Sequence, residues 1–159
     1  MKTYNILFLC THNSARSILG EALASTHPSG KFIGYSAGST PGTSVNRIAA
    51  DIAEELGMDR TLLKSKSWNV FGEPNAPKMD FIITVCDNAA GEACPFWPGQ
   101  PATAHWGFPD PSRVQGTDIE KKAAFIAVMN GLQKRLDILA AMPLDKLDSM
   151  SLKEVHTKA

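Results

Sequence analysis

The chain has 159 residues, of which 43% are hydrophobic and 20% charged, and its formal net charge is +0. This length and composition predict a single globular domain over residues 1–159 with enough apolar residues for a sizeable core. The neutral charge balance argues against nucleic acid or an anionic membrane as the main partner, and no apolar run is long enough to cross a bilayer.

Strand-like and helix-like segments alternate along the chain, as they do in βαβ folds. The predicted strands are Tyr4–Leu9, Phe32–Ser36, Phe81–Val85 and a short segment, His105–Phe108. The predicted helices are Ser17–Ala24, Val45–Leu56 and Ile119–Leu139, with one more short helix expected in the tail Pro143–Ala159. Loops are expected at Ser39–Ser44 and Pro95–Pro101. The pattern predicts an α/β fold with an open, mainly parallel sheet and helices on both faces.

The N-terminal apolar run is too short to direct secretion. Ile6–Leu9 follows Lys2, but polar residues beginning at Thr11 interrupt the run before it reaches the length of a signal-peptide core. The chain is therefore expected to be cytoplasmic.

The three cysteines are Cys10, Cys86 and Cys94. An odd number of cysteines in a cytoplasmic chain argues against a framework of structural disulfides. Cys10 and Cys86 each follow a predicted buried strand. Ligands of open parallel sheets bind beyond the carboxyl ends of the strands, so these two cysteines are expected near each other and near a binding site.

The segment after Cys10 has the pattern of an oxyanion-binding loop. Five residues separate Cys10 from Arg16, and the loop leads from a strand into a helix. Backbone N–H groups at a helix N-terminus converge on an anion, and their dipoles also favour a thiolate over a thiol. The planar guanidinium of Arg16 can bind two oxygens of a tetrahedral anion. The predicted oxyanion-binding residues are Thr11, His12, Asn13, Ser14, Ala15, Arg16 and Ser17.

The segment Leu9–Ser17 resembles the catalytic loop of the low-molecular-weight tyrosine phosphatases, and more closely that of their arsenate-reductase relatives. The resemblance extends over roughly Tyr4–Leu139. It also includes the motifs Tyr35–Gly38 and His105–Pro111. It implies an open four-stranded parallel sheet flanked by helices, and a role for Asn13 in holding the loop. Two residues depart from the family pattern: His12 stands where glycine is common, and Ala15 where phosphatases often have a second loop cysteine.

Asp110 is the predicted general acid. In the resembling families, the aspartate of such an Asp-Pro loop protonates the leaving oxygen, which is otherwise a poor leaving group. The alternative for Asp110-Pro111 is an aspartate that only forms a turn. Asp80, Asp87 and Asp118 are weaker candidates for the acid.

Cys86 and Cys94 distinguish a reductase from a phosphatase, because a phosphatase needs Cys10 alone. The residues between them are small or polar, so the segment has few apolar anchors and can rearrange easily. The resemblance implies that Cys10 attacks arsenate, that Cys86 attacks Cys10 and releases arsenite, and that Cys94 then attacks Cys86. No tightly bound cofactor is expected. An external thiol reductant, with thioredoxin favoured over glutaredoxin or a small thiol, would be the transient partner.

The main alternative is a low-molecular-weight protein tyrosine phosphatase, which the loop and Asp110 also fit. It would leave Cys86 and Cys94 without a use. In addition, Ser112 and Arg113 stand where such phosphatases often have aromatic residues.

Two further alternatives are weaker. A non-catalytic oxyanion sensor is disfavoured because the nucleophile, the arginine and the acid are all present. A zinc site made from the cysteines and His105 is disfavoured because the gap between the second and third cysteines is wider than usual zinc-ligand spacing. Whether a cation binds near the loop stays open, although Lys64 and Lys66 lie in a segment that could reach its back.

Overall fold

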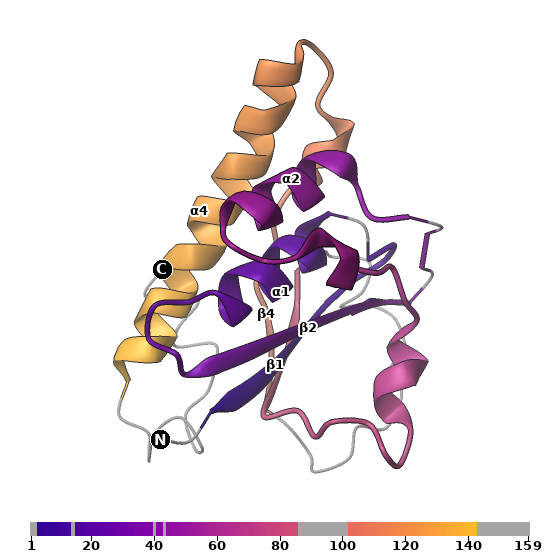
Figure 1. Cartoon of the computed structure of the whole chain (residues 1–159), viewed down its shortest axis with the longest axis vertical. Coiled ribbons are helices and arrows are strands. Elements are labelled where there is room, and N and C mark those ends of the chain that lie inside the picture. Colours follow the sequence, from indigo (N-terminus) through magenta and orange to yellow (C-terminus); the bar gives the residue numbers. More distant parts are fainter. Residues whose placement is uncertain (1–2, 14, 40, 43, 86–101, 143–159) are drawn as a thin grey trace.

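Four parallel strands form the sheet in the computed structural model, which describes residues 3–13, 15–39, 41–42, 44–85 and 102–142 (Figure 1). The strands are β1 (Tyr4–Cys10), β2 (Phe32–Gly38), β3 (Phe81–Thr84) and β4 (Ala102–His105). Their order across the sheet is β2-β1-β3-β4. Consequently β1, which ends at Cys10, lies inside the sheet with a parallel neighbour on each side.

Helical segments cover both faces of this sheet. The α-helices are α1 (Arg16–Ser25), α2 (Arg47–Glu55) and α4 (Asp118–Ala141), and they pack on one face (Figure 1). The 3-10 helices are η1 (Arg60–Leu62), η2 (Trp68–Gly72) and η3 (Pro111–Arg113). η2 covers the other face with Trp68 and Phe71. The expected open four-stranded parallel sheet flanked by helices is confirmed.

The alternation of side chains along β1 divides the core into two parts. Ile6 and Phe8 point to the α-helices, whereas Leu7 and Leu9 point to η2. All four are at most 1% exposed, as expected for a strand buried on both faces. Because β1 is buried on both faces, the end of the strand at Cys10 has a well-defined place in the fold.

Most of the predicted elements are confirmed to within two residues at each end. The helix predicted at Val45–Leu56 starts at Arg47, because Asn46 caps it by accepting hydrogen bonds from the backbone N–H groups of Ile48 and Ala49. The predicted helix Pro143–Ala159 and the predicted loop Pro95–Pro101 lie outside the described residues.

The fourth strand is not where the sequence predicted it. The predicted strand is His105–Phe108, whereas β4 begins at Ala102 and ends at His105. The N–H groups of Trp106 and Phe108 still donate to the carbonyls of Thr84 and Val85, at 2.8 and 3.2 Å. The apolar run therefore marks the exit from the strand, where the chain turns toward the Asp110 loop.

None of the described helices has the length and hydropathy needed to span a membrane.

Candidate active site

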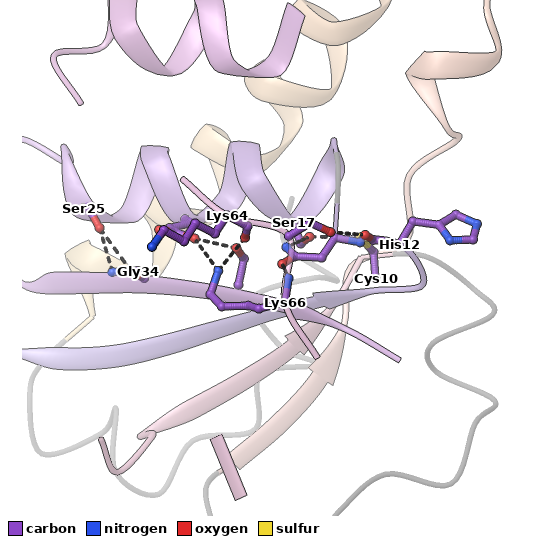
Figure 2. A network of polar contacts seen from close by, with 11 residues as sticks. Cys10, His12, Ser17, Ser25, Gly34, Lys64 and Lys66 are labelled. Carbon is purple, nitrogen blue, oxygen red and sulfur yellow. Dashed lines mark hydrogen bonds and ion pairs between the residues drawn. The ribbon is translucent and has the colours of Figure 1, made fainter. Parts of the chain in front are cut away.

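The sulfur of Cys10 lies in a loop that surrounds it with hydrogen-bond donors. Its Sγ accepts a hydrogen bond from the backbone N–H of Asn13 at 3.2 Å and shares another with Ser17 Oγ at 2.9 Å. Ser17 Oγ also accepts from Asn13 Nδ2 at 2.8 Å, and toward a Cys10 thiolate the Ser17 hydroxyl is the donor, because a thiolate has no hydrogen to give. Figure 2 shows Cys10 and Ser17 joined in this way at the start of α1. The contacts stabilise negative charge on the sulfur.

Asn13 holds the loop in an unusual conformation. Its φ angle is 50°, in the left-handed region that few residues other than glycine adopt. The side chain is completely buried, and its two polar atoms are used: Nδ2 donates to Ser17, and Oδ1 accepts from the backbone N–H of Lys66 at 2.9 Å. These bonds offset the strain and give Asn13 the loop-holding role that the resemblance implies.

The N-terminus of α1 is open toward the loop. Ala15 is its N-cap and offers no side-chain hydrogen bond to the first-turn N–H groups. A helix end in this state is suited to bind an anion. Arg16 is the first residue of α1, and its guanidinium donates from Nη1 to the carbonyl of Phe108 at 2.8 Å. Its Nη2 lies 3.7 Å from Asp110 Oδ2, which brings the predicted acid beside the predicted oxyanion loop.

Gly38 lets β2 approach the loop closely. A Cβ atom at this position would lie 2.5 Å from the carbonyl oxygen of Thr11 and 3.0 Å from the backbone nitrogen of Asn13. Any side chain would therefore push the loop backbone away. This contact explains why a glycine ends the Tyr35–Gly38 motif.

A buried carboxylate lies behind the loop. Glu21 of α1 is 8% exposed, accepts a hydrogen bond from the hydroxyl of Ser36 and lies 3.8 Å from Lys66 Nζ. Burial raises the pKa of Glu21, and the Ser36 hydrogen bond and the Lys66 charge lower it in part. Burial lowers the pKa of Lys66, and the charge of Glu21 opposes this shift. The same Lys66 holds Asn13 through its backbone, so one residue joins the buried charge pair to the loop (Figure 2).

We expect Lys66→Met to lower the free energy of unfolding by about 1–3 kcal/mol at pH 7, because it leaves the buried Glu21 carboxylate without its cation. The folded-state pKa of Glu21 is above its ordinary value. The contribution of Glu21 to stability is therefore fully present below the ordinary pKa, and it is lost as pH rises through the folded-state pKa. Without Lys66 the folded pKa rises further. The deficit should therefore shrink as pH falls.

Denaturant titrations at several values from about pH 4 to about pH 8 measure this effect, because this range begins near the ordinary carboxyl pKa and extends well above it. Lys64→Met is the matched control, because Lys64 is exposed and should change stability by less than about 0.5 kcal/mol. Adding Glu21→Gln to Lys66→Met should recover part of the loss. A deficit that is the same at every pH would contradict the charge-pair explanation.

Asp110 lies at the start of η3 with its two oxygens in different roles. Oδ1 accepts from the backbone N–H of Ser112 at 2.9 Å and from its hydroxyl at 2.6 Å. Oδ2 faces Arg16 and Arg113, each at 3.7 Å. The turn-forming and site-facing interpretations of Asp110 are therefore both compatible with the structure, since one oxygen serves each.

Of the weaker acid candidates, Asp80 lies far from this position. Asp80 Oδ2 accepts from the backbone N–H of Asn5 at 2.8 Å, beside the beginnings of β1 and β3 and therefore at the opposite end of the sheet from Cys10. Asp118 is the first residue of α4. Asp87 lies outside the described residues.

The surroundings of Asp110 keep its carboxyl ionised. Burial acts to raise the pKa of Asp110, but the hydrogen bonds from Ser112 and the charges of Arg16 and Arg113 outweigh burial and leave the pKa below its ordinary value. A bound anion would act in the opposite direction, because negative charge close to a carboxylate favours its protonated form.

Ser112→Ala should raise the pKa of Asp110, because it removes the 2.6 Å hydrogen bond to Oδ1. If Asp110 acts as an acid, the pH above which kcat/KM falls should move upward.

The same substitution should also affect stability. A carboxyl with a lowered folded-state pKa stabilises the fold above its ordinary pKa and loses this contribution as pH falls through the folded-state pKa. That contribution should shrink in the variant. Ser112→Thr keeps the hydroxyl and should restore the original profile; a profile that does not move in Ser112→Ala would assign the pH dependence to another group.

The structure thus brings together Cys10, Arg16 and Asp110 from three different segments. Of the predicted loop residues, Ser14 lies outside the described residues, as do Cys86 and Cys94. Val85, the last described residue before Cys86, accepts a hydrogen bond from Phe108 and so lies beside the Asp110 loop. Glu21, Ser36 and Phe108 were missed as site residues. The only sequence signals were the Tyr35–Gly38 and His105–Pro111 motifs that contain the last two.

No group of three or more histidine, cysteine, aspartate or glutamate side chains that could hold a metal ion occurs within the described ranges. The zinc arrangement considered above depends on cysteines outside those ranges.

Comparisons with known proteins found similarity over most of the chain. The family model of the low molecular weight phosphotyrosine protein phosphatases matches residues 5–152. An arsenate reductase of Halalkalibacterium halodurans is 34% identical over 135 residues, which cover 85% of this chain and 94% of that protein. An arsenate reductase of Bacillus subtilis is 34% identical over 136 residues, which cover 86% and 94%. A solved structure described as an arsenate reductase in the oxidized state aligns with a TM-score of 0.66 at 26% identity, covering 89% of this chain and 98% of that one.

Proposed function

The chain belongs to the low molecular weight phosphotyrosine protein phosphatase family, and we propose that within this family it is an arsenate reductase. Curated relatives that match over most of its length carry that name. The observation that carries the proposal is the Cys10 sulfur, which receives hydrogen bonds inside a loop with Arg16 and Asp110 at its edge. Such a site can bind a tetrahedral oxyanion and attack it with a thiolate.

In the first step, the Cys10 thiolate attacks As(V) while the first-turn N–H groups of α1 and the Arg16 guanidinium bind the arsenate oxygens. A sulfur–arsenic bond forms, and one oxygen leaves as water. Asp110 supplies a proton to that oxygen, because the negative charge of the bound arsenate raises the fraction of Asp110 that is protonated. The hydrogen bonds from Asn13 and Ser17 hold the attacking sulfur.

In the second step, the Cys86 thiolate attacks the Cys10 sulfur. The sulfur–arsenic bond breaks, and its electron pair stays on arsenic, which leaves as arsenite. Two thiols have then supplied the two electrons, and Cys10 and Cys86 form a disulfide. In the third step Cys94 attacks Cys86, which frees Cys10 and leaves a Cys86–Cys94 disulfide.

The remaining disulfide needs an external thiol reductant for each turnover. We favour thioredoxin as the donor, because an intramolecular disulfide between cysteines near each other in sequence is the kind of bond that a dithiol reductant exchanges with. The cytoplasm, where thiols are kept reduced, is the compartment that suits this cycle.

The deciding experiment is a coupled assay that contains the protein, arsenate, thioredoxin, thioredoxin reductase and NADPH. We expect arsenate-dependent oxidation of NADPH and release of arsenite. A parallel assay with para-nitrophenyl phosphate measures phosphatase activity, which should be much slower. Fast hydrolysis of this ester without any arsenate-dependent turnover would replace the reductase assignment with a phosphatase.

A further inference from the structure

Phe108 rests on α4 at a position that only glycine allows. The half-buried ring faces Gly131, where a Cβ atom would lie 2.5 Å from the ring carbon Cε1 and 3.1 Å from Cζ. Glycine is a poor residue for a helix interior, so its presence in the middle of α4 calls for a packing reason. The approach of the Phe108 ring supplies one.

Arg135, one turn further along α4, also packs against the Phe108 ring. The guanidinium carbon lies 4.8 Å from the centre of the Phe108 ring, a cation–π contact, and Nη1 donates to the carbonyl of Gly131 at 3.0 Å. Arg135 Nε is buried and has no hydrogen-bond partner among the described residues. The ring is therefore held between Gly131 and Arg135.

The backbone of Phe108 connects this packing contact on α4 to the site. Its carbonyl accepts the 2.8 Å hydrogen bond from Arg16 Nη1, and its N–H donates to the carbonyl of Val85, the residue that follows β3. Asp110 follows two residues later. The position of the ring on α4 is thus linked, through the backbone of one residue, to the carbonyl that holds Arg16.

We propose that Phe108, packed against Gly131 and Arg135, is a positioning residue for the oxyanion-binding guanidinium of Arg16. The proposal rests on the proposed function only in assigning Arg16 to oxyanion binding. Arginine binds a tetrahedral anion through a planar fork, so a carbonyl that takes one of its N–H groups also sets the plane of the fork. Phe108 acts on the anion through Arg16 and does not contact it.

Gly131→Ala tests this proposal without altering any group of the loop. The added methyl group displaces the Phe108 ring, and we expect inorganic phosphate to bind on the order of ten-fold more weakly, as after the loss of one hydrogen bond to a charged group. Phosphate affinity is measured as protection of Cys10 against alkylation by iodoacetamide, read by mass spectrometry. In arsenate turnover, KM should rise more than kcat falls. Asn130→Ala, an exposed neighbour on α4, is the matched control and should change neither quantity.

A second pair of variants separates the ring from the helix. Phe108→Ala should weaken phosphate binding by itself, and adding Gly131→Ala to it should cause no further loss, because there is no ring left to displace. Unchanged phosphate affinity in Gly131→Ala, or an equal further loss in the Phe108→Ala background, would overturn the proposal. A wild-type protein that binds phosphate but does not turn over arsenate would refute the reductase function and leave this test intact.

Discussion

Asp110→Asn should slow the first chemical step by about a hundred- to ten-thousand-fold, which is the usual range for general-acid catalysis. The asparagine keeps a side-chain oxygen that can accept from Ser112, so η3 should retain its N-cap. It cannot supply a proton to the departing arsenate oxygen. The measurement is the rate of a single turnover, followed by rapid quenching and quantification of arsenite.

Two controls make this result specific to the acid. Phosphate affinity should stay within a few-fold of wild type, because Arg16 and the loop N–H groups are unchanged. Asp118→Asn removes a carboxylate from the first turn of α4 and should have almost no effect on the single-turnover rate. A near-normal rate in Asp110→Asn would mean that the aspartate only forms the turn before Pro111.

The part of the site nearest to Cys10 could be predicted because its signals are local in sequence. The apolar run of β1, the loop and the start of α1 are contiguous, and their hydrogen bonds join residues at most seven positions apart. Among the described residues of the loop, only Asn13 needs a conformation that is rare for its residue type, and the resemblance implies its role. Local spacing was therefore enough to predict which residues form this loop.

The support behind the loop could not be predicted in the same way. Glu21 and Ser36 are fifteen residues apart, and Lys66 reaches Asn13 from fifty-three residues away. The sequence shows Glu21 as one more charged residue on a helix, and burial by tertiary packing gives it a different role. Gly131 is similar: by propensity it only weakens α4, whereas in the fold it makes room for Phe108.

The placement of β4 failed for a related reason. Large apolar side chains usually mark a buried strand, but the observed strand Ala102–His105 has no large apolar residue, and Trp106 and Phe108 follow it. Trp106 is fully buried and Phe108 packs on α4, so the large residues anchor the exit from the sheet. Periodicity alone cannot distinguish a short strand from the anchored segment after it.

Cys86→Ser and Cys94→Ser should each abolish multiple-turnover arsenate reduction, but at different stages. In the proposed relay Cys86 is the thiol that attacks the Cys10–arsenic adduct, so almost no arsenite should be released without it. Without Cys94, one equivalent of arsenite should appear and a Cys10–Cys86 disulfide should accumulate, because nothing frees Cys10 from it. Mass spectrometry of arsenate-treated protein, after free thiols have been trapped, identifies the disulfide in each variant.

Neither substitution alters a residue of the oxyanion loop, so any phosphatase activity should survive in both variants, whereas Cys10→Ser should eliminate both activities. This contrast separates the two chemistries, because ester hydrolysis uses Cys10 alone and needs no electrons. Arsenate reduction needs two electrons for each arsenite, and within this chain the second thiol must come from Cys86 or Cys94. Wild-type arsenate turnover in both variants, with no disulfide that contains Cys86, would rule out the relay and assign the second thiol to an external reductant.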